Sequence, residues 1–235
     1  MRDTIAVPLT TSTATKVAQL RSMKLGVLGR HRSIPHLGRK AYHLVMGLVC
    51  FSLYAFLLTR EQALLTLATV GGVWVVCDLL RLRFSAVNAL ALRIFGGLMR
   101  REELKGISAN TYYIWGMFTV VLFFPKPIVL LSLLYLAVGD PVAAMVGTLY
   151  GRHRFIAGKS VEGAAANFLA SGVVTALAAL FYFHLPVDRS LTLAIVGGVV
   201  SAVAELIPLP INDNFTIPVL SAMLLTLVTR ALPLF

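Results

Sequence analysis

The chain has 235 residues, of which 58% are apolar and 13% are charged, whereas an average soluble domain has about 45–50% and about 25%. Its mean hydropathy of +0.84 comes from several long apolar runs, which exclude a soluble fold and predict an all-α, polytopic membrane protein. The 21 Lys and Arg exceed the 10 Asp and Glu, and in a membrane protein this excess first reports loop orientation. Nucleic acid is therefore not expected as a partner.

Residues 1–40 are polar and carry eight basic residues against one acid, Asp3. They lack the apolar core of a secretory signal. This composition predicts a basic cytoplasmic tail over residues 1–38, followed by a single transmembrane domain over 39–235. A targeting peptide has a similar composition and remains the alternative.

Apolar runs then predict about seven membrane spans, most near the ~20 residues that cross hydrocarbon. They lie at 41–58, 62–80, 108–124, 127–150, 161–183, 190–207 and 215–235. Between the second and third, apolar residues recur at helical spacing from Val87 to Leu98, which favours an amphipathic helix lying in the interface. The alternative is that this stretch belongs to a tilted extra span.

The basic residues agree with seven spans. The segments on one side, including the N-terminus, hold 17 Lys and Arg, and those on the other side hold 4. By the positive-inside rule the N-terminus is cytoplasmic. Seven of the ten acids fall in, or at the membrane end of, the same cytoplasmic segments, which predicts a charged site on that face.

Asp140 is the most informative residue. Ten residues separate it from Gly151, so a straight helix would place it about 15 Å deep, where a carboxylate costs about 2.5 kcal/mol or more. The local sequence Gly139-Asp140-Pro141 predicts a helix break, because the residue before a proline avoids the helical region. Asp140 would then N-cap a half-helix over 141–150 that faces a polar cavity, or it would merely cap a kink.

The connection after this segment contains Gly158-Lys159-Ser160. A P-loop is excluded, because six residues rather than four separate Gly151 from Gly158 and a membrane helix precedes the loop. Gly158, Lys159, Ser160 and Arg152 could still bind phosphate beside a helix N-terminus, although an inside loop is expected to be basic anyway.

The last inside connection carries Asn212-Asp213-Asn214 and no basic residue. These residues suit a turn. Together with Glu205 and Asp140, however, Asp213 also offers the oxygen ligands that Mg²⁺ prefers beside phosphates. At the first span, His43 lies one turn beyond Arg39-Lys40 at the inner membrane edge; it either snorkels or takes part in function.

These pieces resemble the CTP-dependent lipid kinase family, which includes dolichol, phytol and CTP-using diacylglycerol kinases and is related to phosphatidate cytidylyltransferase. The resemblance covers about residues 38–220. It rests on motifs in a common order: Arg39-Lys40-x-x-His43, Asp78-x-x-Arg81, Arg101-Glu102, Gly139-Asp140-x-x-Ala143, Gly158-Lys159-Ser160-x-Glu162-Gly163, and Glu205 with Asp213-Asn214 and Pro218.

The resemblance implies transfer of the CTP γ-phosphate to the primary hydroxyl of a lipid alcohol at the cytoplasmic membrane face, with Mg²⁺. Asp140, Asp213 and Glu205 are the predicted metal ligands, while Lys159, Ser160, Gly158 and Arg152 are expected to bind phosphates. Asn214 and Arg81 complete the predicted nucleotide site, and His43 is a further catalytic candidate. Glu162 or Glu102 is the expected base, and the sequence does not choose between them. The acceptor and the oligomeric state stay open.

A cytidylyltransferase, which makes a CDP-lipid from a phosphorylated lipid and CTP, is the nearest alternative because it needs the same metal and nucleotide. A transporter also has broken helices and intramembrane acids, but the two halves of this sequence lack matching interrupted segments.

Overall fold

The computed structural model describes residues 33–96, 99, 102–155 and 158–232, without the side chains of 33–37 and Glu102. The predicted tail over 1–38 lies almost wholly outside these residues. The α-helices are α2 (Ser33–Ser52), α3 (Arg60–Arg83), α4 (Ser85–Phe95), α5 (Ala109–Phe123), α6 (Lys126–Leu134), α7 (Asp140–Leu149), α8 (Val161–Leu177), α9 (Val187–Leu206) and α10 (Asp213–Ala231). Three π segments, η1 (Leu53–Leu57), η3 (Tyr135–Gly139) and η5 (Ala178–Tyr182), and a 3₁₀ turn, η2 (Glu102–Leu104), complete the described elements.

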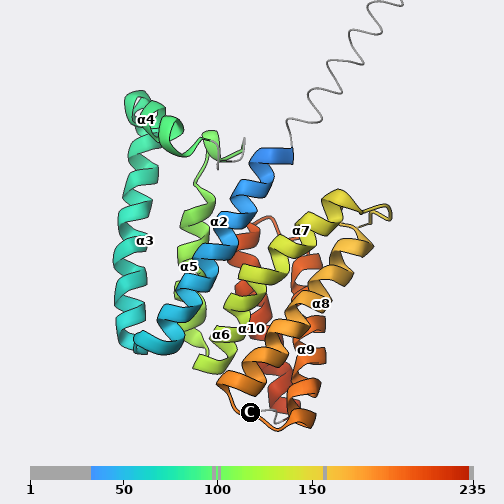
Figure 1. The fold of residues 1–235 in the computed structure, drawn as a ribbon. Coiled ribbons are helices and arrows are strands. Elements are labelled where there is room, and N and C mark those ends of the chain that lie inside the picture. Colours follow the sequence, from blue (N-terminus) through green and yellow to red (C-terminus); the bar gives the residue numbers. More distant parts are fainter. Residues whose placement is uncertain (1–32, 97–98, 100–101, 156–157, 233–235) are drawn as a thin grey trace, which may run out of the picture. The chain divides into compact units, whose positions relative to one another are not determined.

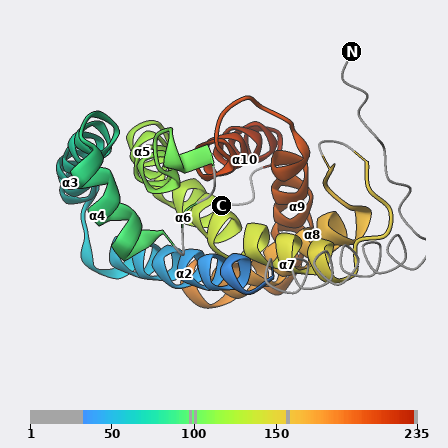
Figure 2. The same cartoon turned by 90° about the horizontal axis from the view of Figure 1, so that it is seen from above.

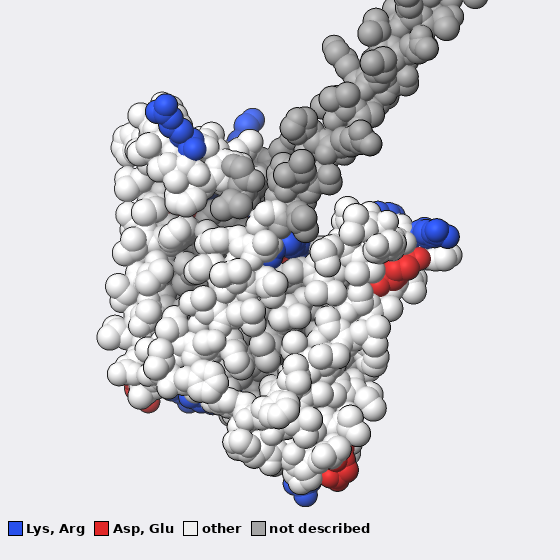
Figure 3. Space-filling view, viewed as in Figure 1, with Lys and Arg blue, Asp and Glu red and all other residues white. Residues whose placement is uncertain are grey.

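The helices confirm an all-α membrane protein. Among the described residues, six helical stretches are long and apolar enough to cross a bilayer. In the space-filling view, the charged residues lie at the two ends of the molecule and an uncharged band separates them (Figure 3). α5 has 15 residues, fewer than the ~20 that cross hydrocarbon, so a seventh crossing stays a prediction.

The stretch from α6 through η3 to α7 is the centre of residues 39–235. In the most apolar 18-residue part of this stretch, 78% is buried inside the protein, a larger share than in any other described span. Tyr135, Leu136 and Ala137 of η3 are fully buried. α5, α8, α9 and α10 surround this central helix (Figures 1 and 2). The segment that carries Asp140 is therefore the element against which the others pack.

The predicted break at Asp140 is wrong. Gly139 and Asp140 both have right-handed helical backbone angles, and no side chain caps α7 at Gly139. The chain instead stays helical and widens into the π segment η3 just before Pro141. A proline lacks an N–H and its ring clashes with the preceding turn, and a π turn relieves this clash because its hydrogen bonds skip one more residue. Asp140 thus belongs to a bulged helix rather than to a half-helix end.

The helix predicted between the second and third spans is present as α4. It has 11 residues, is separate from α3 and is too short to span a bilayer. From the end of α3, α4 turns across the top of the molecule toward α2 (Figure 2). It therefore adds no crossing to the chain.

Candidate functional site

The connections that follow α3, α7 and α9 reach the same end of the molecule, which we call the upper face (Figure 1). Five charged side chains from four helices and one loop gather below it, and we call them the Asp140 cluster. They are Lys40, Asp140, Lys159, Glu205 and Asp213.

A close ion pair joins the first span to the central helix. Nζ of Lys40 lies 2.5 Å from Oδ2 of Asp140, and the two side chains are 16% and 11% exposed. The sequence predicts that burial of the Asp140 carboxylate costs free energy. The ammonium group of Lys40, one hundred residues earlier in the chain, offsets this cost, because a buried charge needs a close partner.

Lys159 connects the glycine-containing loop to the ends of α9 and α10. Its ammonium group donates a hydrogen bond to the backbone carbonyl of Glu205 and lies 3.9 Å from Oδ2 of Asp213. Lys159 is also near enough to interact electrostatically with Asp140. Two cations thus neighbour the buried aspartate, an arrangement that suits an anionic ligand.

A buried amide network supports the other side of the cluster. Asn167 of α8 donates to Oε2 of Glu205 at 2.6 Å, and its carbonyl oxygen accepts from Ser171 and Ser201 at 3.0 and 2.6 Å. Gly139 packs against this network, because an added Cβ would lie 2.5 Å from Oγ of Ser171. The glycine before Asp140 is required by this close approach.

The loop between α7 and α8 is held by its own polar contacts. Ser160 N-caps α8 by accepting a hydrogen bond from the N–H of Gly163 at 3.1 Å. Gly158 has φ +76°, which glycine adopts without strain, and its carbonyl accepts from Arg154 at 2.8 Å. Arg152 is exposed at the outer edge of this loop. These contacts fix the turn that presents Lys159.

Glu162 lies on the outer side of that loop. Its carboxylate is 2.8 Å from Nδ1 of His153 and accepts weakly from the backbone N–H of the same residue. These contacts place Glu162 against the loop and not within the Asp140 cluster. The other expected base, Glu102, has a side chain outside the described residues.

The first turn of α10 supplies Asn214. Asn212 N-caps this helix by accepting from the N–H of Asn214 at 3.0 Å, so the predicted turn is a cap and the beginning of a helix. The buried Asn214 side chain donates to the carbonyl of Ala109 at 3.0 Å, joining α10 to α5. Asn214 is also a polar neighbour of His43.

His43 lies between the Asp140 cluster and α5. Its ring packs edge-on against Tyr113 at 5.1 Å between centroids and is near enough to Asp140 for electrostatic interaction. The residue is 7% exposed, and among the described residues its Nε2 has no hydrogen-bond partner. A buried nitrogen without a partner is costly, so this atom is a candidate for contact with substrate.

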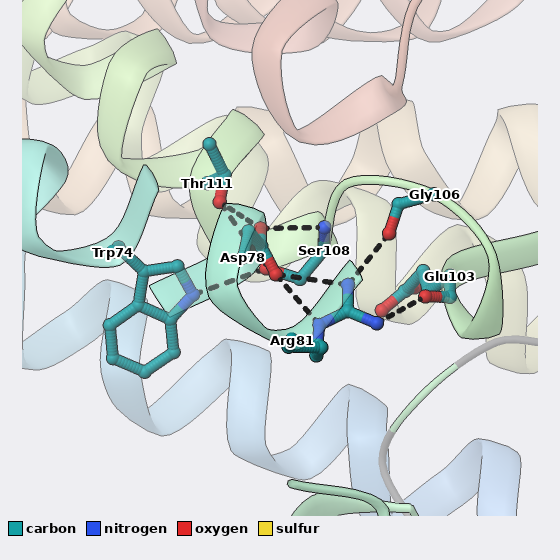
Figure 4. A network of polar contacts seen from close by, with 7 residues as sticks. All are labelled: Trp74, Asp78, Arg81, Glu103, Gly106, Ser108 and Thr111. Atoms are coloured by element: carbon teal, nitrogen blue, oxygen red, sulfur yellow. Dashed lines mark hydrogen bonds and ion pairs between the residues drawn. The ribbon is translucent and has the colours of Figure 1, made fainter. Parts of the chain in front are cut away.

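Arg81 and Asp78 form a separate network (Figure 4). Oδ1 of Asp78 accepts from Arg81, and Oδ2 accepts from the N–H and hydroxyl of Ser108 and from Thr111. Arg81 also donates to the carbonyls of Glu103 and Gly106. These bonds fasten the connection before α5 to α3. The hydrogen bonds of Arg81 join it to Asp78, Glu103 and Gly106 and not to the Asp140 cluster, so Arg81 is not part of the nucleotide site proposed below.

The predicted magnesium ligands can be compared with this arrangement. Among the described residues, no three His, Cys, Asp or Glu side chains are grouped as metal ligands, so Asp140, Asp213 and Glu205 do not form a protein cage. Mg²⁺ beside a nucleotide usually takes one or two carboxylates, with phosphates and waters as the other ligands. Asp140 and Asp213, each near Lys159, are carboxylates of that kind, so the donor set fits the ion.

Sequence reasoning had not assigned site roles to Lys40 and Asn167. Lys40 stood in the motif that ends at His43, but nothing local showed that it pairs with Asp140. Asn167 is an amide inside an apolar run, which is unusual enough in a membrane helix to have been a signal.

Comparisons with known proteins find lipid kinases among the relatives of this chain. The chain is 32% identical over 212 residues to "CTP-dependent diacylglycerol kinase 1" of Saccharomyces cerevisiae, covering 82% of this chain and 73% of the yeast protein. It is 34% identical over 205 residues to the protein of the same name from Eremothecium gossypii, covering 78% and 64%. It is 30% identical over 130 residues to "Probable phytol kinase, chloroplastic" of Triticum aestivum, covering 51% and 43%.

No family model matches the chain, and no solved structure is similar to it. The yeast relative is nevertheless 32% identical along most of both sequences, and six helical stretches in the described part of this chain are long and apolar enough to cross a membrane. The chain belongs to the CTP-dependent lipid kinase family.

Proposed function

We propose that this chain transfers the γ-phosphate of CTP to the primary hydroxyl of a lipid alcohol, with diacylglycerol as the first candidate acceptor. The observation that carries the proposal is the Asp140 cluster, where three carboxylates and two lysines meet below the upper face. The names of the relatives supply CTP and diacylglycerol. Phosphoryl transfer needs mainly positioned charge, and this cluster provides it.

Each charged side chain has a role in binding the triphosphate. Lys40 and Lys159 neutralise phosphate oxygens, which gain charge as the bond to the leaving group breaks. Asp140 keeps Lys40 in place at 2.5 Å, and the loop that ends in the Ser160 cap keeps Lys159 in place. Mg²⁺, when bound by Asp140 and Asp213, supplies further positive charge at the phosphates.

The reaction forms a bond between the lipid oxygen and the γ-phosphorus and breaks the bond from that phosphorus to the oxygen bridging it to the β-phosphate. CDP leaves, and the hydroxyl proton passes to a base. We assign this base to His43, since its unpartnered Nε2 lies beside the cluster. Glu162, engaged with His153, instead orders the loop.

The test uses the full-length protein in mixed micelles with Mg²⁺ and CTP labelled on either the γ- or the α-phosphorus. Diacylglycerol, phytol, dolichol and, as the substrate of a cytidylyltransferase, phosphatidate are offered separately, and γ-labelled ATP is a control for the nucleotide. We expect the γ label, and not the α label, in the diacylglycerol product. An α label in lipid would identify a cytidylyltransferase, and lipid without label for every acceptor would reject a kinase.

A further inference from the structure

A divided apolar cavity lies between α2, α3, α4 and α5. Its smaller part, of about 240 Å³, lies between α2, α3 and α5, and its larger part, of about 410 Å³, extends beneath α4. Tyr42, His43, Trp74 and Asn110 line both parts. We call the two parts together the α4 cavity.

The walls of the α4 cavity are mostly hydrocarbon. Met46, Leu67, Val70 and Met117 line the smaller part. The apolar stripe of α4 lines the larger part, through Val87, Leu90, Ala91, Ile94 and Phe95. Leu90 and Ile94 are 58% and 62% exposed. The apolar stripe of α4, which the sequence predicts to lie in the membrane interface, therefore covers a space that the described side chains do not fill. Hydrocarbon is the occupant that such walls favour.

Two polar atoms along the cavity lack partners. They are Nε2 of His43, a residue that lines both parts, and Oε1 of Glu103, a residue that lines the larger part. Among the described residues neither atom has a hydrogen bond, although their residues are only 7% and 6% exposed. Buried polar atoms are almost always satisfied, so these atoms indicate a ligand with a polar group as well as apolar chains.

His43 also faces the phosphate site. It interacts electrostatically with Asp140 and Lys40 while lining the cavity. One residue therefore belongs to both places, and a hydroxyl at Nε2 would lie beside the cluster proposed to hold the triphosphate.

We infer that the α4 cavity is the binding site of the lipid acceptor. The acceptor's hydroxyl contacts His43, and its hydrocarbon chains fill the space between α2, α3, α5 and the apolar stripe of α4. This inference rests on the proposed function, because it assigns a binding site to the lipid that accepts the phosphate. α3 packs against α5, while α2 makes few direct contacts with α3, so the cavity lies where chains can enter from the bilayer.

A matched pair of substitutions on α4 tests the inference. Ala91 lines the cavity, and Ala89, two residues earlier on the same helix, does not. We expect Ala91→Phe to raise the KM for long-chain diacylglycerol about tenfold, the scale of a steric change in an apolar pocket. The KM for CTP should stay unchanged, and dioctanoylglycerol should be affected less than the long-chain lipid. Ala89→Phe should leave both constants near those of the unsubstituted protein.

Protection of a cysteine gives a second readout that does not need catalysis. Cys77 is an exposed free thiol that lines the cavity. In a Cys50→Ala protein, dioctanoylglycerol without nucleotide should slow maleimide labelling of Cys77 several-fold. The control is Val199→Cys in a protein that also carries Cys50→Ala and Cys77→Ala, because Val199 is exposed on α9 away from the cavity. Its labelling should not change.

The two readouts separate the proposals. Equal KM values for Ala91→Phe and Ala89→Phe, in a protein that still phosphorylates diacylglycerol, would overturn the cavity assignment and leave the kinase proposal intact. Protection of Cys77 in a protein that transfers no γ-phosphate to any lipid would support lipid binding and reject the kinase proposal. Absence of protection would contradict the cavity site.

Discussion

At the scale of single residues, the ion pair between Lys40 and Asp140 is the main feature of the candidate site. A carboxylate inside a membrane protein is stable when a cation lies close, and the pair is 2.5 Å apart with both side chains largely buried. Lys159 adds a second cation near the same carboxylate. Positive charge is therefore held next to negative charge in the part of the protein where we propose that the triphosphate binds.

Replacement of this aspartate should abolish transfer. We expect Asp140→Asn to lower CTP-dependent diacylglycerol phosphorylation a hundredfold or more, roughly the loss seen when one electrostatic contact to a transition state is removed. Incorporation of γ label into lipid measures the effect. Asp188→Asn is the matched control, because Asp188 lies at the lower end of α9, near its first turn. Wild-type turnover in Asp140→Asn would remove the aspartate from the mechanism.

Asp78 has a different role, which a stability measurement can show. Its side chain is 6% exposed and accepts hydrogen bonds from Arg81, Ser108 and Thr111. Asp78→Asn leaves the buried guanidinium of Arg81 without its counter-charge, so we expect a loss of about 3 kcal/mol in the free energy of unfolding. Thermal unfolding in detergent should show this loss, while the KM for CTP of the folded fraction stays unchanged. An altered KM with unchanged stability would place Asp78 in the nucleotide site instead.

At the scale of elements, the central helix shows how a proline is accommodated without a break. The π segment η3 precedes Asp140-Pro141 and packs against α8, α9 and α10. Each of these helices contributes a residue to the site or its support: Asn167, Glu205 and Asp213. The bulge therefore brings the aspartate to the place where three other helices supply polar groups.

The close packing at this bulge makes Gly139 sensitive to one added carbon. A Cβ at Gly139 would lie 2.5 Å from Oγ of Ser171 and 2.9 Å from Oδ1 of Asn167, whereas a Cβ at Gly72 meets no atom within 4 Å. We expect Gly139→Ala to lower the free energy of unfolding by about 1–3 kcal/mol, as overpacking does. Gly72→Ala should leave it unchanged or raise it slightly. Equal melting temperatures for the two variants would contradict the described packing.

At the scale of the whole chain, charge divides the protein into two ends and an apolar middle. The space-filling view shows this division (Figure 3), and six described helical stretches are long enough to cross the middle. The Asp140 cluster and the basic loop after α7 are at the same end. In the proposed reaction, the nucleotide would reach this end from water and the lipid would reach it from the bilayer.

The orientation of this end follows from the positive-inside rule and can be measured. Exposed Arg154 lies in the loop after α7, and exposed Arg189 lies at the opposite end of the molecule, near the beginning of α9. In a background with Cys50→Ala and Cys77→Ala, we expect an impermeant maleimide applied to intact cells to label Arg189→Cys and to spare Arg154→Cys. Permeabilisation should expose both. The reverse pattern would place the upper face outside the cytoplasm.

The sequence by itself determined the class of fold and most of the charged residues of the site. Long apolar runs and a basic excess are properties of composition, and a carboxylate inside such a run needs a partner wherever the helix lies. Asp140 could be named for this reason, Lys159, Glu205, Asp213 and Asn214 could be named from their places in or beside the cytoplasmic connections, and their motifs resemble those of the CTP-dependent lipid kinase family.

The tertiary structure decided what contacts what. The ion pair joins residues that are 100 positions apart, and no local pattern encodes such a distance. The local sequence favours a helix break at Pro141. The helix stays continuous there because packing against the surrounding helices makes a π bulge more stable than the break. Arg81 belongs to a structural network with the connection before α5, and His43 belongs to a cavity wall that α4 completes, so the neighbours that define both roles come from elsewhere in the chain.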